Sequence, residues 1–203
     1  MTKPVGALKE RHNDKTAGGF REIGKAFMKC TDHLTQDHKV ILRALDILDH
    51  MALRVGNNQP VDAEDVHAIL RFFRAFADDH HQAKEESALF PELRTLPTQQ
   101  GPLRQMLFEH NQERSLVEGL EEALYTKKGG DFVYFADRLS SLLRNHIHKE
   151  DHILFDIVER TLSAEQDERV MAEFAKFEFN PSSVADLRRL EWKYLRRGAS
   201  VCA

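Results

Sequence analysis

Two ten-residue segments of this chain repeat a pattern of side chains that could bind a metal. Residues 81–90 read HQAKEESALF and residues 146–155 read HIHKEDHILF, so His, Lys, Glu, Leu and Phe recur in one frame. Positions i and i+4 of a helix lie one turn apart on one face, so each copy could present an imidazole and a carboxylate together. The pairs are His81 with Glu85 and His146 with Glu150.

Both pairs continue apolar stripes, so we expect them to point into a core. Helical spacing puts His81 in series with Leu70 and Ala77. It puts His146 in series with Leu139. A buried imidazole or carboxylate is costly unless it is paired or bound to a metal.

Two further helices each supply one histidine on the same kind of stripe. They are His38 and His110, and an acid precedes each, Asp37 and Glu109. The chain therefore reads as two helical hairpins in series, each a single-histidine helix followed by a His-x-x-x-Glu helix. A single inward histidine is more often a hydrogen-bonded core residue than a ligand. Four of them, one per helix, with two inward glutamates favour a metal site over a structural network.

The remaining histidines serve as a control for this interpretation. At ~100° per residue, His50 lies about 120° from His38, and His148 and His152 lie about 160° and 120° from His146. We therefore predict that these three are surface residues. His80 adjoins His81, so a register that is shifted by one residue stays open there.

Four amphipathic segments must position these groups. Short loops join them, so they predict an all-α, up-down-up-down antiparallel four-helix bundle. The predicted helices are Thr35–Leu53, Asp62–Phe90, Leu103–Tyr125 and Phe132–Arg160.

The bundle, residues 31–160, is expected to carry an extension at each end. Residues 1–30 predict an irregular arm with a short helix around 21–30. Residues 161–203 predict two further helices, Ser163–Glu178 and Ser183–Arg197. The last one is basic and amphipathic, and we expect it to pack across the bundle rather than contact a membrane or a partner.

Composition limits the function classes. The chain has 203 residues and a formal net charge of −4, which argues against nucleic acid as a partner. No apolar run reaches the ~18–20 residues of a membrane span, and the N-terminus lacks an apolar signal region. The two cysteines, Cys30 and Cys202, are typical of free thiols in a reducing compartment, so we predict a cytoplasmic protein. A disulfide between the two stays open.

Four imidazoles and two carboxylates are too many ligands for one tetrahedral zinc. They suit two ions that each bind two histidines, with Glu85 and Glu150 as bridges and with water or an oxo group completing the set. Mixed nitrogen and oxygen ligation favours two iron ions, with manganese or zinc as competitors.

At this point the chain resembles the hemerythrin-like family, the HHE cation-binding domains. The resemblance covers about residues 31–160 and implies a di-iron four-helix bundle. It rests on DH at 37–38, H-x-x-x-E followed by LFP at 81–91, EH at 109–110 and HIHKED at 146–151.

The match departs from the oxygen-carrying members on the third helix, and on the fourth helix it leaves the ligand open between Glu150 and Asp151. Those have a second histidine four residues after the first on the third helix, where this chain has Arg114. They also have an aspartate five residues after the histidine of the fourth helix, where this chain has Asp151. Glu150 remains preferred over Asp151, because Glu150 matches Glu85 in the repeat.

A set of four His and two Glu is nearest to the di-iron domain of iron-sulfur-cluster repair proteins, which respond to nitric oxide and oxidative stress. Their N-terminal cysteine-bearing domain has no counterpart in residues 1–30 beyond Cys30. Ferritin-like proteins use Glu-x-x-His instead and are excluded. The resemblance implies that the protein binds or reduces O₂, NO or peroxide, or handles iron under stress. A reversible O₂ carrier or sensor, and a metal-binding bundle without turnover, stay open.

Overall fold

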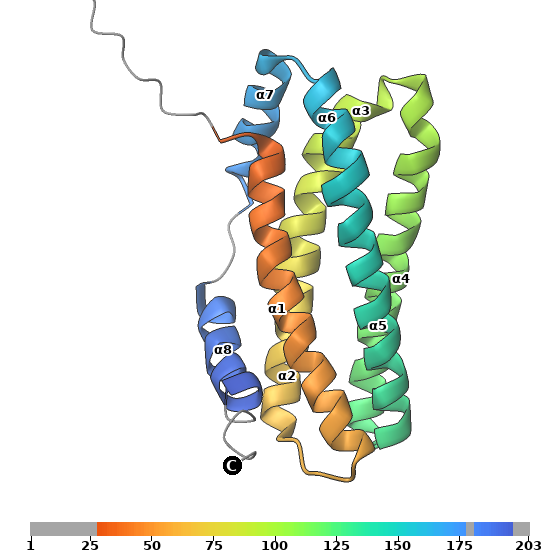
Figure 1. Cartoon of the computed structure of the whole chain (residues 1–203), viewed down its shortest axis with the longest axis vertical. Coiled ribbons are helices and arrows are strands. Elements are labelled where there is room, and N and C mark those ends of the chain that lie inside the picture. The colour runs from red at the N-terminus through yellow and green to blue at the C-terminus, as the bar shows by residue number, and fades with distance from the viewer. Residues whose placement is uncertain (1–27, 178–180, 197–203) are drawn as a thin grey trace, which may run out of the picture.

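The protein is described by a computed structural model that places residues 28–177 and 181–196, and every regular element in these ranges is helical (Figure 1). Four long helical segments lie side by side along one axis and alternate in direction, so the predicted four-helix bundle is confirmed. The first and third segments are α1 (Cys30–Gly56) and α4 (Gln100–Tyr125). The second consists of α2 (Ala63–Phe72), η1 (Phe73–Gln82), η2 (Glu85–Leu89) and α3 (Phe90–Arg94). The fourth consists of α5 (Gly129–Lys149), η4 (Glu150–Leu154) and α6 (Phe155–Thr161).

All four predicted bundle helices were too short, the third and fourth by three residues at their starts. The first begins at Cys30 rather than Thr35, so Cys30 is part of the bundle and not of an arm. The second begins as expected, because the Asp62 side chain accepts a hydrogen bond from the Glu64 amide, but it continues past Pro91. Pro91 stands in the first turn of α3, where a missing N–H costs little. The short turn η3 (Pro97–Gln99) then leads into α4.

Three π-helical segments interrupt the second and fourth helices: η1, η2 and η4. A π turn widens the backbone ring and is found frequently at functional sites. Together these segments carry His81, Glu85 and Glu150, three of the six predicted metal-site residues.

The core consists of two hydrophobic clusters, one toward each end of the bundle. One includes Ile41 and Val117, and the other includes Leu34 and Met106. Along α1 and α4 the histidines lie between these residues, so a polar layer separates two apolar ones.

The C-terminal part forms α7 (Ala164–Phe174), α8 (Pro181–Glu191) and η5 (Trp192–Arg196). In Figure 1, α8 lies against the outer face of α1 and α2. Leu187, Leu190 and Tyr194 are buried there, which confirms that the basic helix packs on the bundle. The buried Asp65 carboxylate accepts hydrogen bonds from Arg189 and Tyr194 at 2.6 and 2.8 Å, and from Lys193. The predicted helix around 21–30 lies outside the described residues up to residue 27, and Cys202 lies outside them as well. Met28 and Lys29 are not helical, and Cys30 begins α1.

Candidate metal centre

The six predicted residues converge in the polar layer of the bundle. They form two groups that share both glutamates, and in each group the candidate ligand atoms lie within 4.8 Å of one another. All six side chains are buried, with Glu85 and Glu150 at zero exposure. The first group is His38, His81, Glu85 and Glu150, and the second is Glu85, His110, His146 and Glu150.

In each group the two imidazoles point their Nε2 atoms at one another. The distance is 3.1 Å between His38 and His81, and 3.1 Å between His110 and His146. Each group therefore contributes a pair of convergent ring nitrogens, and the two carboxylates lie where both pairs can share them.

The other nitrogen of every imidazole faces a carboxylate from a neighbouring helix. Two of these acids precede a histidine in the sequence, and the other two follow one of the shared glutamates. The four contacts from Nδ1 are His38 to Asp151 at 2.8 Å, His81 to Asp37 at 3.5 Å, His110 to Glu86 at 2.7 Å and His146 to Glu109 at 2.9 Å.

This ring of carboxylates fixes how the imidazoles are protonated. At His38, His110 and His146 the carboxylate lies within hydrogen-bond distance and accepts the proton of Nδ1 in the neutral imidazole, which leaves the Nε2 lone pair to bind a metal. The Nδ1 of His81 makes no hydrogen bond within the described residues and lies 3.5 Å from Asp37. Two facing lone pairs at 3.1 Å repel each other unless a cation or a proton lies between them. None of the four oxygens of Glu85 and Glu150 has a hydrogen-bond partner among the described residues, although all are buried. The donor set thus fits a bound metal cation.

A family model of the hemerythrin HHE cation-binding domain matches residues 30–158. This chain belongs to the hemerythrin HHE family. Searches of curated proteins and of solved structures gave no match. The family and the two His/Glu groups together indicate a metal-binding bundle. No helix in the described part of this HHE domain is both long and apolar enough to span a membrane.

The electrostatics of the HHE domain favour positive charge at its centre. Burial lowers the pKa of His38, but Asp151 and Glu150 outweigh this effect and raise it to about 9. Burial also lowers the pKa of His110, but Glu85 and Glu86 outweigh this effect and raise the pKa to about 9. Metal ions must compete with protons for these nitrogens, so metal affinity should fall at low pH.

The lysines and phenylalanines that the two decapeptides share also contact residues of the centre. Lys84 Nζ donates a hydrogen bond to Asp37 at 3.0 Å, and Lys149 donates one to Glu109. Each lysine therefore positions one of the four carboxylates behind the imidazoles. The final phenylalanines cover the imidazoles. Phe155 stacks on His38 with ring centroids 5.5 Å apart, and Phe90 stacks on His110 at 5.9 Å.

The structure places the residues whose roles the sequence did not decide. Asp151 lies behind His38 and is absent from both ligand groups, so the register with Glu150 inward agrees with the structure. His80 is buried outside the groups, where its Nε2 lies 2.6 Å from Lys84 Nζ. Arg114 does not point at the centre but binds Asp78 and Glu86, each at 2.8 Å. His50, His148 and His152 are exposed, as predicted.

The sequence interpretation noticed the acids before His38 and His110 but gave them no role, and it missed Glu86. The signal was present, because an acid follows the glutamate in both decapeptides, as Glu86 and Asp151. What the pattern could not reveal is that each acid serves an imidazole of another helix.

Proposed function

We propose that this HHE domain is a non-haem di-iron protein in which the six convergent residues are the ligands. One iron is held by His38 and His81, and the other by His110 and His146. Glu85 and Glu150 bridge the two ions. The two overlapping ligand groups support this arrangement, since each offers two nitrogens and the same two carboxylates.

The observation that carries the proposal is the pair of facing Nε2 contacts. In each group the two Nε2 atoms lie 3.1 Å apart, and the buried oxygens of Glu85 and Glu150 make no hydrogen bond within the described residues. Six buried polar groups in this state would destabilise the fold unless cations satisfied them. Nitrogen-rich ligation with carboxylate bridges suits iron.

Two iron ions bound here would supply redox chemistry toward small oxidants such as O₂, NO or peroxide. The chain's own residues hold the imidazoles in one tautomer, exclude bulk water and fix the spacing of the ligands. Phe90 and Phe155 shield the centre through their contacts with His110 and His38.

We further propose that the protein reduces or binds such oxidants irreversibly, as in stress defence or iron handling, rather than carrying O₂. This rests on the ligand count, because the third helix supplies only His110, and Arg114 points away toward Asp78. The set is nearest to that of the iron-sulfur-cluster repair proteins. A reversible O₂ carrier or sensor is the second candidate, which the nitrogen-rich ligand set favours.

One cycling experiment separates the two candidates. Iron(II)-loaded protein is exposed to O₂ and then flushed with argon while the visible spectrum is followed. We expect conversion without recovery of the iron(II) spectrum, and binding of NO in a parallel sample. Repeated recovery over several cycles would make the protein an O₂ carrier or sensor. The His152→Ala variant, altered at an exposed histidine, is the matched control and should behave as wild type.

A further inference from the structure

The two hairpins differ in what covers their outer faces. On the first hairpin, Phe72 and Phe76 lie in one hydrophobic cluster with Leu187 and Leu190 of α8. The repeat relates that face to the outer face of α4 and α5. There, none of the described residues forms a cover, and the right-hand side of Figure 1 lies open.

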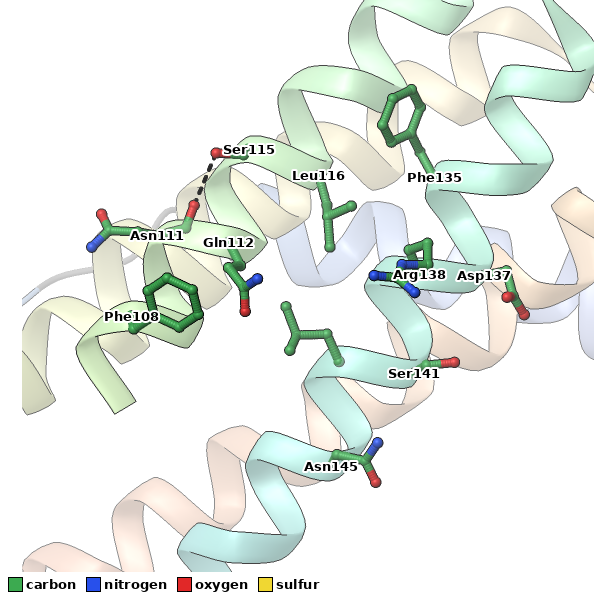
Figure 2. Close-up of a pocket in the computed structure, with 11 residues that line it drawn as sticks. Phe108, Asn111, Gln112, Ser115, Leu116, Phe135, Asp137, Arg138, Ser141 and Asn145 are labelled. Atoms are coloured by element: carbon green, nitrogen blue, oxygen red, sulfur yellow. Dashed lines mark hydrogen bonds between the residues drawn. The ribbon is translucent and has the colours of Figure 1, made fainter. Parts of the chain in front are cut away.

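The uncovered face holds a groove of about 660 Å³ whose lining comes only from α4 and α5. Its floor includes Leu116 and Leu142. Figure 2 shows Phe108 toward one end and Phe135 toward the other, with Leu116 between them. The Phe108 side chain is 56% exposed.

Gly119 allows the Phe135 ring to pack at its end of the groove. A Cβ at Gly119 would lie 2.6 Å from the Phe135 ring, so the ring packs directly on the α4 backbone. Phe108 and Gly119 are eleven positions apart on one helix, which is about 16 Å along the axis. The groove therefore presents an aromatic ring near each end.

The rim is polar but carries no excess of one charge. Gln112, Ser141 and Asn145 supply groups that both donate and accept, and Asp137 stands beside Arg138. Neither of these two charged side chains pairs with another described residue. The α8 site on the other hairpin is different, because its buried Asp65 selects a basic helix.

We propose that this groove is a self-association surface, and that its occupant is the same face of a second copy of this chain. A twofold contact must be self-complementary, so residue i meets j and j meets i. Amides can pair with amides, and Asp137 of one copy with Arg138 of the other.

The face is large enough for such a dimer. α4 has 26 residues, so it is about 39 Å long, and two helices side by side are roughly 20 Å wide. This gives on the order of 780 Å², close to the ~800 Å² that each partner of a stable complex contributes. The polar rim suits an interface that is more hydrated than a domain core.

Sedimentation equilibrium of the metal-loaded full chain tests the proposal. We expect a dimer at about 100 µM. Phe108→Ala and Ser141→Arg should each weaken it at least about tenfold. Leu53→Arg, at an exposed leucine of α1, is the matched control and should leave it unchanged.

A charge swap distinguishes self-pairing from other contacts. Asp137→Arg should weaken the dimer, because two arginines then stand beside each other on both copies. Adding Arg138→Asp should restore it, since the pair is complementary again. A wild-type chain that stays monomeric at about 100 µM overturns the proposal, whatever else binds this face. A dimer that persists in Phe108→Ala and Ser141→Arg also overturns it, because the contact then lies elsewhere. Unchanged metal content shows that each variant is folded.

Discussion

The two hairpins deliver matching ligands to the centre but differ one helical turn away from it. Three residues after the single histidine, the first hairpin has Ile41 where the second has Glu113. One residue after the paired histidine, the first has Gln82 where the second has Ile147. The structure joins the two polar members, because Gln82 donates a hydrogen bond to Glu113. The symmetry is kept at the six residues that converge in the polar layer, and it is lost one turn away from them.

The outer faces of the two hairpins also differ. The face of the first hairpin is apolar and is covered by α8, whereas the face of the second is amide-rich and open. If the metal centre imposes the symmetry, changes to equivalent ligands should have equal effects. Changes away from the centre should have unequal ones.

Removing a bridge should have the largest effect. Glu85→Ala and Glu150→Ala should each release most of both ions, because a bridging carboxylate contacts both. Metal analysis after gel filtration measures the loss. His50→Ala is the control and should keep wild-type metal content, since His50 is exposed. Loss of one ion in one variant and both in the other would break the symmetry between the hairpins.

The carboxylates behind the imidazoles should have the next largest effect. Asp151→Asn and Glu86→Gln should each weaken metal binding about 10–100-fold without abolishing it, because they orient His38 and His110. Competition with a coloured chelator gives the affinities. If Asp151→Asn strips the metal while Glu150→Ala does not, Asp151 is the ligand and the assignment of the fourth helix is wrong.

Glu113 should give the second hairpin a pH dependence that Ile41 does not give the first. Burial raises the pKa of Glu113 to about 7. Between about pH 4.5 and 7 the folded chain keeps this proton while the unfolded chain has released it. The contribution of protonated Glu113 to stability is therefore full below pH 4.5 and is lost as the pH rises through 7. In metal-depleted protein, Glu113→Gln should therefore raise the unfolding free energy at pH 8 by on the order of 1–3 kcal/mol, and by less at pH 5. Equal gains at both pH values would contradict this, as measured by urea unfolding.

Asp65 should give a smaller effect on the first hairpin only. Burial opposes its charge, but Lys193 and Arg189 outweigh burial and lower its pKa. Its contribution to stability is therefore present above the unfolded pKa near 4 and is lost as the pH falls through the folded value. Asp65→Asn should cost about 1–2 kcal/mol at pH 7 and leave metal content intact. Asp156→Asn, in an exposed ion pair with Arg160 at 3.2 Å, should change stability by less than about 0.5 kcal/mol.

The sequence predicted the four helices and the six convergent side chains because both depend on spacing along one helix. His81 and Glu85 share a face whatever the rest of the chain does. It could not predict that Asp37 serves His81 or that Glu109 serves His146, because these contacts depend on which helices are neighbours. The continuation past Pro91 depends on a π segment, which a count at 100° per residue does not represent. The partners of Asp65 could not be predicted either, since they lie more than 120 residues away in α8 and η5.

Iron content per chain is the most direct test of the central claim. Protein reconstituted with iron(II) and freed of excess metal should hold about two iron ions per chain, because two nitrogen pairs share two carboxylates. The His148→Ala variant should hold the same amount, since His148 is exposed. A value of about one at full occupancy, unchanged when more iron is supplied, would contradict a shared binuclear centre.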